Sequence, residues 1–163
     1  MTAKNTFKTN LDNIHKKLTY VSDWMYDNPE LGFEEFKTSK YLVEFIKSFD
    51  HAVTYPTGKL DTAFEITFGT EGPLTVLCVE YDALPEIGHA CGHNIIATAS
   101  IGAGLAIANL VEELGIRVKL LGTPAEEGGG GKIILLDNGV FEDAACSMMI
   151  HPAYENVVNP TFT

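Results

Sequence analysis

Four short segments of this 163-residue chain carry side chains of the kinds that bind divalent metal ions. In chain order they are His89-Ala90-Cys91-Gly92-His93, Pro124-Ala125-Glu126-Glu127, the glycine run Gly128 to Gly131 with Lys132, and Ile150-His151-Pro152. Thiolate, imidazole and carboxylate are all donors that a zinc-like cation accepts. A structural zinc knuckle clusters its ligands in short cysteine pairs, whereas these mixed donors are dispersed, each at the end of an apolar run. The pattern is typical of a catalytic site, which keeps one metal position open for water.

Cys91 and His93 are expected to share one cation, with His89 beside them as a supporting residue. These three occupy alternate positions, and alternate residues of an extended stretch lie on the same face. For this segment alone, a turn in which the histidines cap a helix is the alternative. Glu127 and His151 at the ends of later strands favour metal binding, because the carboxyl ends of strands in an α/β sheet converge on one crevice.

The adjacent Glu126 and Glu127 suit two different tasks. Neighbouring side chains point in different directions, so one carboxylate can hold a metal while the other takes a proton from water. An exposed acidic pair at a strand end is the alternative, but Pro124 and the four glycines indicate a backbone that packs closely against something. Earlier in the chain, Asp82 is placed to accept a hydrogen bond from a ligand histidine. A turn-forming aspartate before Pro85 explains it nearly as well.

Composition argues against several classes of protein. The chain has 22 acidic against 11 basic residues and a net charge of −11, so no nucleic-acid or anionic-membrane surface is expected. Three widely spaced cysteines give no disulfide framework, and Cys78 and Cys146 lie in apolar runs and are expected to be buried. The first ten residues lack the apolar segment of a secretory signal, and no apolar stretch reaches a membrane span. A cytoplasmic location is therefore expected.

The apolar pattern predicts an α/β fold in one domain. Helical spacing runs from about residue 10 to 48, with a break at Asn28-Pro29 and a resumption at Glu34. Further helices are expected over 94–114 and 131–138, and short apolar strands over 63–68, 74–79, 118–121 and 145–150. Because helices alternate with buried strands, a layered and mostly parallel sheet is expected.

These segments resemble the M20 family of metal-dependent peptidases and amidohydrolases. The resemblance rests on the stretch from Glu80 to His93, the stretch from Gly122 to Lys132, and Asn28-Pro29-Glu30-Leu31-Gly32 with Glu34. It is strongest to the cysteine-containing branch of aminoacylase-like, hippurate-hydrolase-like and aminobenzoyl-glutamate-hydrolase-like enzymes. Within that branch the chain looks most like the M20-domain-containing protein 2 dipeptidases. The resemblance covers nearly the whole chain.

The resemblance implies a three-layer α/β/α catalytic domain of the zinc-peptidase type. It implies hydrolysis of an amide bond in an N-acyl amino acid or a dipeptide, with one or two Zn²⁺ or Mn²⁺ ions. The residues that it implies for the site are four metal ligands, a general base and a supporting carboxylate: Cys91, His93, Glu127 and His151; Glu126; and Asp82.

Length is the departure from the family. Its members are more than twice as long and carry an inserted dimerisation domain, by which they form homodimers. A returning catalytic segment then supplies one more metal-binding histidine. Residues 1–163 are therefore expected to be the amino-terminal part of an incomplete catalytic domain. A catalytically inactive metal-binding or interaction fragment is the main alternative. A redox protein using Cys91 is disfavoured, because no second cysteine lies nearby.

Overall fold

The computed structural model describes residues 2–153. Its helices and strands follow in the order α1 (Ala3–Asp27), α2 (Phe36–Lys47), β1 (Glu65–Phe68), β2 (Leu74–Val79), α3 (His93–Ile107), α4 (Val111–Leu114), β3 (Arg117–Gly122), α5 (Glu126–Gly129), α6 (Gly131–Asp137) and β4 (Ala144–Met148). Within these residues, no helix is both long enough and apolar enough to cross a membrane.

The strands form one sheet in the order β1-β3-β2-β4. β2 pairs in parallel with β3 and with β4, while β1 pairs antiparallel with β3. Parallel neighbours require a crossover connection. Here α3 and α4 connect β2 to β3, and α5 and α6 connect β3 to β4. The predicted α/β class with a mostly parallel sheet is confirmed.

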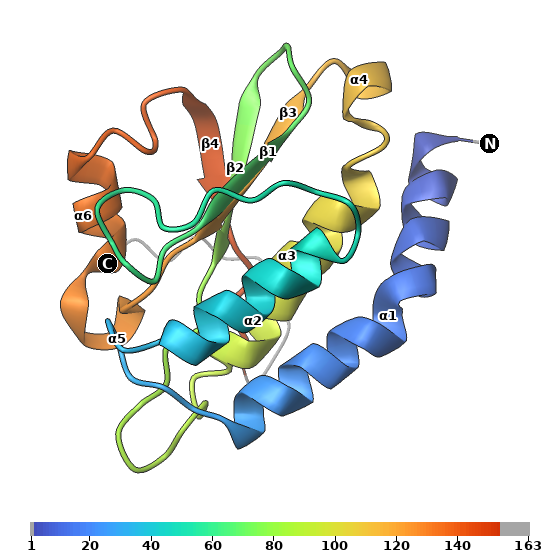
Figure 1. Cartoon of the computed structure of the whole chain (residues 1–163). Helices are drawn as coiled ribbons and strands as arrows, with labels where there is room; N and C mark the ends of the chain where they lie inside the picture. The colour runs from blue at the N-terminus through green and yellow to red at the C-terminus, as the bar shows by residue number, and fades with distance from the viewer. Residues whose placement is uncertain (1, 154–163) are drawn as a thin grey trace.

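Apolar side chains cover both faces of the sheet, which gives three layers. Helices α1, α2 and α3 pack on one face, against Ile66, Val79 and Leu120 among others. On the other face Leu135 of α6 packs in a second cluster with Val76 of β2. Figure 1 shows the sheet between these two helical layers. The α/β/α architecture implied by the family resemblance is therefore present.

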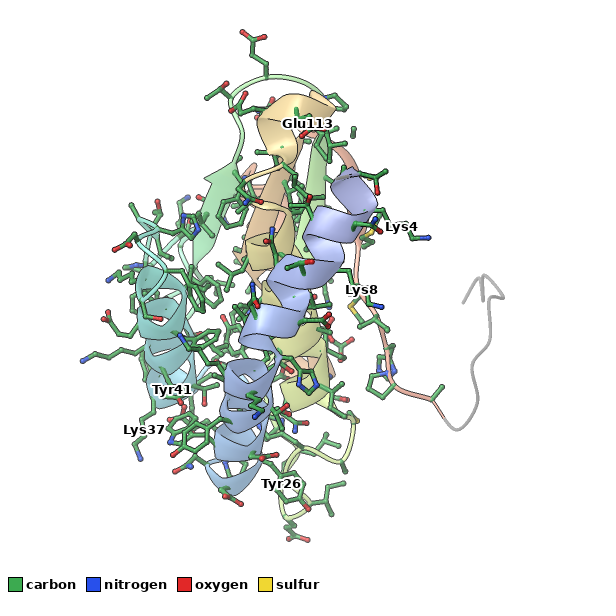
Figure 2. All side chains as sticks on the ribbon, turned by 90° about the vertical axis from the view of Figure 1, so that its right-hand side faces the viewer. Lys4, Lys8, Tyr26, Lys37, Tyr41 and Glu113 are labelled. Carbon is green, nitrogen blue, oxygen red and sulfur yellow. The ribbon has the colours of Figure 1, made fainter. Side chains whose placement is uncertain are left out.

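Helix α1 illustrates how sequence spacing fixes a layer. Leu18, Val21 and Met25 recur every three or four residues and are buried, so one face of α1 packs on α3. Figure 2 looks onto the outer side of α1, where Lys4 and Lys8 extend away from the ribbon. The outer side of α1 is exposed to water, and its polar residues suit that position.

Three predicted elements differ in the structure, the first being α1, which begins at Ala3 rather than at about residue 10. The strand expected over 145–150 spans Ala144–Met148, and its side chains are largely exposed rather than buried. Among the described residues β4 pairs only with β2 and lies at the sheet edge. Cys146 is consequently exposed, so its predicted burial was wrong, whereas Cys78 in β2 is buried as expected. The helix expected over 94–114 is divided, since α3 ends at Ile107 and α4 follows after a turn.

Candidate metal site

The candidate site lies where β2 and β3 end. Glu80 and Asp82 follow β2, Glu126 and Glu127 open α5 shortly after β3, and His93 is the first residue of α3. Because β2 and β3 are parallel, their carboxyl ends meet at the same edge of the sheet. Topology therefore brings together residues that are far apart in the sequence.

His93 lies at the centre of the site and is buried. Its Nδ1 atom lies 2.8 Å from the carbonyl oxygen of Asp82 and 3.1 Å from Asp82 Oδ1. Both partners accept hydrogen bonds, so Nδ1 carries the proton and Nε2 presents the lone pair of a neutral ring. Burial favours a lower pKa for His93, but the hydrogen bond and charge of Asp82, with the charge of Glu80, outweigh it and raise the pKa.

Three carboxylates surround Nε2 of His93. Glu80 Oε2 lies at 3.5 Å, Glu127 Oε1 at 3.6 Å and Glu126 Oε2 at 3.8 Å. Nε2 has no hydrogen-bond partner in the part of the chain that the structure describes. One donor atom each from Glu80, His93 and Glu126 lies within 4.8 Å of the other two. An imidazole lone pair facing several carboxylates is an arrangement that suits a divalent cation.

Glu80 belongs to this group, although the sequence interpretation did not identify it as a site residue. It is fully buried, with one oxygen toward His93 and the other in an ion pair with Lys132. A buried carboxylate is costly unless charged or polar groups compensate it. The available signal was its position, because Glu80 is a charged residue directly after the apolar run 74–79, at the end of a central strand.

Asp82 connects two parts of the site. Its Oδ1 atom faces His93, and its Oδ2 atom accepts a hydrogen bond of 3.0 Å from the backbone N–H of Glu127. Burial favours a higher pKa for Asp82, but hydrogen bonds from His93 and from the backbone of Glu127 and Glu126 lower it. Asp82 is therefore an ionised carboxylate that ties the end of β2 to the start of α5.

Cys91 lies half-buried beside Glu127. The Glu127 carboxylate, partial burial and the charges of Glu126 and Asp82 raise the pKa of the Cys91 thiol to about 11. His89 is buried, and neither of its ring nitrogens has a hydrogen-bond partner within residues 2–153. Burial and the neighbouring His93 lower the pKa of His89. The site thus gathers negative charge around one thiol and two buried imidazoles.

His151, the fourth predicted ligand, makes no hydrogen bond or ion pair with these residues in the described part of the chain. It is exposed, and its Nδ1 atom lies 2.8 Å from the carbonyl oxygen of Pro152. The segment still passes the site, because a Cβ added to Gly92 would lie 2.7 Å from Pro152 Cγ. Gly92 has φ +79°, and this conformation and the close approach both require glycine. The backbone after β4 therefore touches the turn between Cys91 and His93.

Comparison with known proteins gives individual relatives, although no protein-family profile matches the chain. The chain is 34% identical over 156 residues to one of the subunits of p-aminobenzoyl-glutamate hydrolase from Escherichia coli, covering 84% of this chain and 32% of that protein. It is 38% identical over 165 residues to human Xaa-Arg dipeptidase, covering 90% of this chain and 38% of that protein. The chain thus spans about a third of the length of these curated relatives.

A solved structure shows the same fold. A dinuclear metal-binding peptidase of the M20 family from Bacillus subtilis superposes with a TM-score of 0.74 at 24% identity, covering 83% of this chain and 42% of that one. At this identity the likeness shows the fold alone. The hydrolase and dipeptidase relatives share sequence over most of the chain. From this shared sequence and this fold together, we conclude that the chain belongs to the M20 family of metal-dependent peptidases and amidohydrolases.

Proposed function

We propose that residues 1–163 form part of a metal-dependent hydrolase that cleaves amide bonds in N-acyl amino acids or dipeptides. The observation that carries this proposal is the lone-pair nitrogen of His93 facing three carboxylates at the ends of parallel strands. The names of the relatives, p-aminobenzoyl-glutamate hydrolase and Xaa-Arg dipeptidase, support a small amide substrate.

A divalent metal ion fits the residues of this site. Nε2 of His93 and the Oε2 atom of Glu80 are buried without a hydrogen-bond partner in the described chain, and a cation would satisfy them. The thiol of Cys91 favours Zn²⁺ because sulfur is a soft donor, while the carboxylates also suit Mn²⁺. When bound, one or two such ions would polarise the amide carbonyl and acidify water.

The proposed ligands are Cys91, His93, Glu127 and His151. Glu127 is well placed for two reasons. Its backbone N–H donates a hydrogen bond to Asp82, and the Glu127 carboxylate contacts the Cys91 thiol. Its side chain is 27% exposed, against 38% for Glu126. The Nδ1 atom of His151 faces the carbonyl of Pro152, which leaves Nε2 as the nitrogen that would join the other ligands.

Glu126 is the proposed general base, because it is the more open of the two glutamates to water and substrate. Its carboxylate would take a proton from the attacking water and return it to the leaving nitrogen. Glu126 also lies close to Glu80 and His93, so the competing assignment makes Glu126 the metal ligand and Glu127 the general base.

In the full-length protein, Glu126→Gln should lower kcat by roughly 10² to 10⁴ at normal metal content. Glu127→Gln should lower metal content as well, and the opposite result would exchange the two roles.

Metal binding is the first test of this function. The metal-free protein is titrated with zinc in a calorimeter, and Cys91→Ala and His93→Ala should each weaken binding by about 10-fold or more. Cys146→Ala is the matched control, because Cys146 is an exposed thiol on β4. Wild-type affinity in both site variants would contradict the proposed ligands.

A metal-binding part without turnover is the second candidate, since the chain spans about a third of its relatives. We propose that catalysis also requires residues outside 1–163, including a further metal-binding histidine, and a homodimeric full-length protein. The 163-residue protein is assayed against N-acyl amino acids and dipeptides with zinc and with manganese. Little or no turnover is expected. Rates of about 1 to 10³ per second, which are typical of enzymes, would show that this part is sufficient.

A further inference from the structure

Glu35 is a fully buried carboxylate just before α2, outside the group of residues around His93. Its Oε1 atom accepts a hydrogen bond of 2.8 Å from the backbone N–H of Ala125. Its Oε2 atom accepts one of 3.0 Å from the hydroxyl of Thr62. Burying an acidic group costs stability unless it is hydrogen-bonded, and both oxygens of Glu35 are bonded to loops distant in sequence. This side chain therefore joins three separate segments inside the protein.

The first of these segments contains the turn that carries both site glutamates. Ala125 is fully buried and left-handed, with φ 55° and ψ 50°, a conformation that is unfavourable for a non-glycine residue. Glu35 holds its N–H, and a Cβ added to Gly32 would lie 3.0 Å from Ala125 Cα. The chain leaves β3 at Gly122, turns at Ala125 and enters α5 at Glu126. Where Glu126 and Glu127 lie thus depends on how Ala125 is held.

The second segment connects Glu35 to the other half of the site. The hydroxyl of Tyr81 donates a hydrogen bond of 2.6 Å to the carbonyl oxygen of Thr62. Tyr81 is fully buried and stands between Glu80 and Asp82 in the chain. Its ring is stacked with Phe64, with a centroid distance of 5.8 Å. A buried chain of contacts therefore runs from Ala125 through Glu35 and Thr62 to Tyr81.

We propose that Glu35 is a positioning residue that fixes the spacing between the two halves of the metal site. One half is Glu80 and Asp82 after β2, and the other is Glu126 and Glu127 after β3. This inference rests on the proposed function, because it assigns Glu35 to the site proposed to hold metal. Supporting contacts matter at such sites, since losing one typically lowers metal affinity 10- to 100-fold.

The test compares three variants of the 163-residue protein by zinc titration. Each is first melted by circular dichroism, and binding is measured well below its transition so that only folded protein is compared. Glu35→Leu removes both acceptors and should weaken zinc binding by about 10-fold or more. Glu35→Gln keeps a carbonyl for Ala125 and an amide that can bond Thr62, so it should recover most of the affinity. Glu34→Gln changes the exposed neighbour and should bind as the wild type does.

Tyr81→Phe provides an independent test of the same network. It removes only the hydroxyl that bonds Thr62 and keeps the ring that stacks on Phe64, so zinc affinity should fall while the fold remains. A folded Glu35→Leu with wild-type zinc affinity would overturn the positioning role, leaving Glu35 a purely structural residue. If Glu35→Leu does not fold, wild-type affinity in Tyr81→Phe overturns it instead. A wild-type protein that binds no zinc would refute the proposed function itself, which is a different result.

Discussion

Glu80 and Lys132 form an ion pair at the edge of the candidate metal site. Glu80 is fully buried, whereas the Lys132 side chain is 33% exposed, so the lysine can reach water if its partner is lost. In the pair, Lys132 supplies positive charge to a carboxylate that also faces Nε2 of His93. The lysine and an incoming metal ion therefore compete electrostatically for Glu80.

This competition predicts opposite effects for the two partners. Glu80→Gln should weaken zinc binding, because it removes a negative charge close to the proposed ligands. Lys132→Met should strengthen it, because Glu80 then offers its full charge to the cation. Each shift should be about 10-fold, or about 1.4 kcal/mol in binding free energy. Zinc titration measures both. Lys119→Met, which breaks the pair with Glu65 between β3 and β1, is the control, and shifts of the same sign in both site variants would contradict the competition.

Glu35 should make the stability of the metal-free protein depend on pH. Burial, with a smaller contribution from the charge of Asp82, raises the pKa of Glu35 above its ordinary 4.5, although hydrogen bonds from Ala125 and Thr62 act in the opposite direction. A raised folded-state pKa means that the folded protein holds the proton more tightly. The resulting stabilisation is complete below the unfolded pKa and is lost as pH rises through the folded value.

Glu35→Gln cannot titrate at this position, so the two proteins should diverge with pH. As pH rises above the ordinary pKa of 4.5, the free energy of unfolding of the wild type should fall relative to that of Glu35→Gln. Urea unfolding at several pH values measures the difference without metal. A difference that stays constant across this range would show that Glu35 titrates as it does in the unfolded chain.

At the scale of elements, α2 begins on a cap that is supplied from a distance. The residue at its N-cap position, Glu35, makes no side-chain capping bond. Glu30 takes that role, accepting from the N–H of Lys37 at 3.2 Å and of Thr38 at 2.7 Å. Its negative charge also suits the positive end of the helix dipole. Glu30 thus stabilises the helix and anchors the loop that holds Gly32 and Glu35.

Loss of this cap should destabilise the protein measurably. Glu30→Ala should lower the free energy of unfolding by about 1 kcal/mol, within the usual range of roughly 0.5–2 kcal/mol for a lost cap. Glu30→Gln keeps an acceptor and should lose less. Thermal or urea unfolding measures both variants, and an unaffected Glu30→Ala would mean that water replaces the cap without cost.

Elements with a strong apolar period could be predicted from the sequence, and others could not. The spacing in α1 and the apolar run of β2 depend only on local pattern, so their positions were expected. Helix α5 was not expected, because half of its four residues are glycine. It forms because Ala125 turns the chain and Asp82 bonds the N–H of Glu127. The exposure of β4 was also missed, since an apolar strand does not reveal whether another element covers it.

The same distinction applies to the site residues. The spacing of Cys91 and His93 and the adjacent glutamates point to metal chemistry because these residue types are donors. Glu80 and Glu35 were missed because pattern reasoning places acidic residues on the surface. Both are buried by contacts with segments far away in sequence, namely Lys132 for Glu80 and Ala125 for Glu35. Such partners become visible only once the fold is known.

At the scale of the whole molecule, exposed apolar side chains lie on helix α6 and at the end of the edge strand β4. Ile133 and Leu136 on α6 are 64% and 60% exposed, and Met148 at the end of β4 and Ile150 just beyond it are 54% and 61% exposed. In the described residues β4 has one paired side, so its other edge offers backbone groups to another strand. Exposed apolar patches and open strand edges both promote self-association.

Net charge opposes this association, so salt should control it. The charge of −11 makes copies of the chain repel one another, but the screening length falls from about 10 Å at 0.1 M salt to about 3 Å at 1 M. The apparent mass of the 163-residue protein should therefore rise with salt in light scattering. Leu136→Glu should suppress this rise, because it places a charge within the apolar surface of α6. Leu114→Glu, at an exposed leucine of α4, should not. A constant monomer mass at every salt concentration, or equal suppression by both variants, would show that α6 and β4 do not drive association.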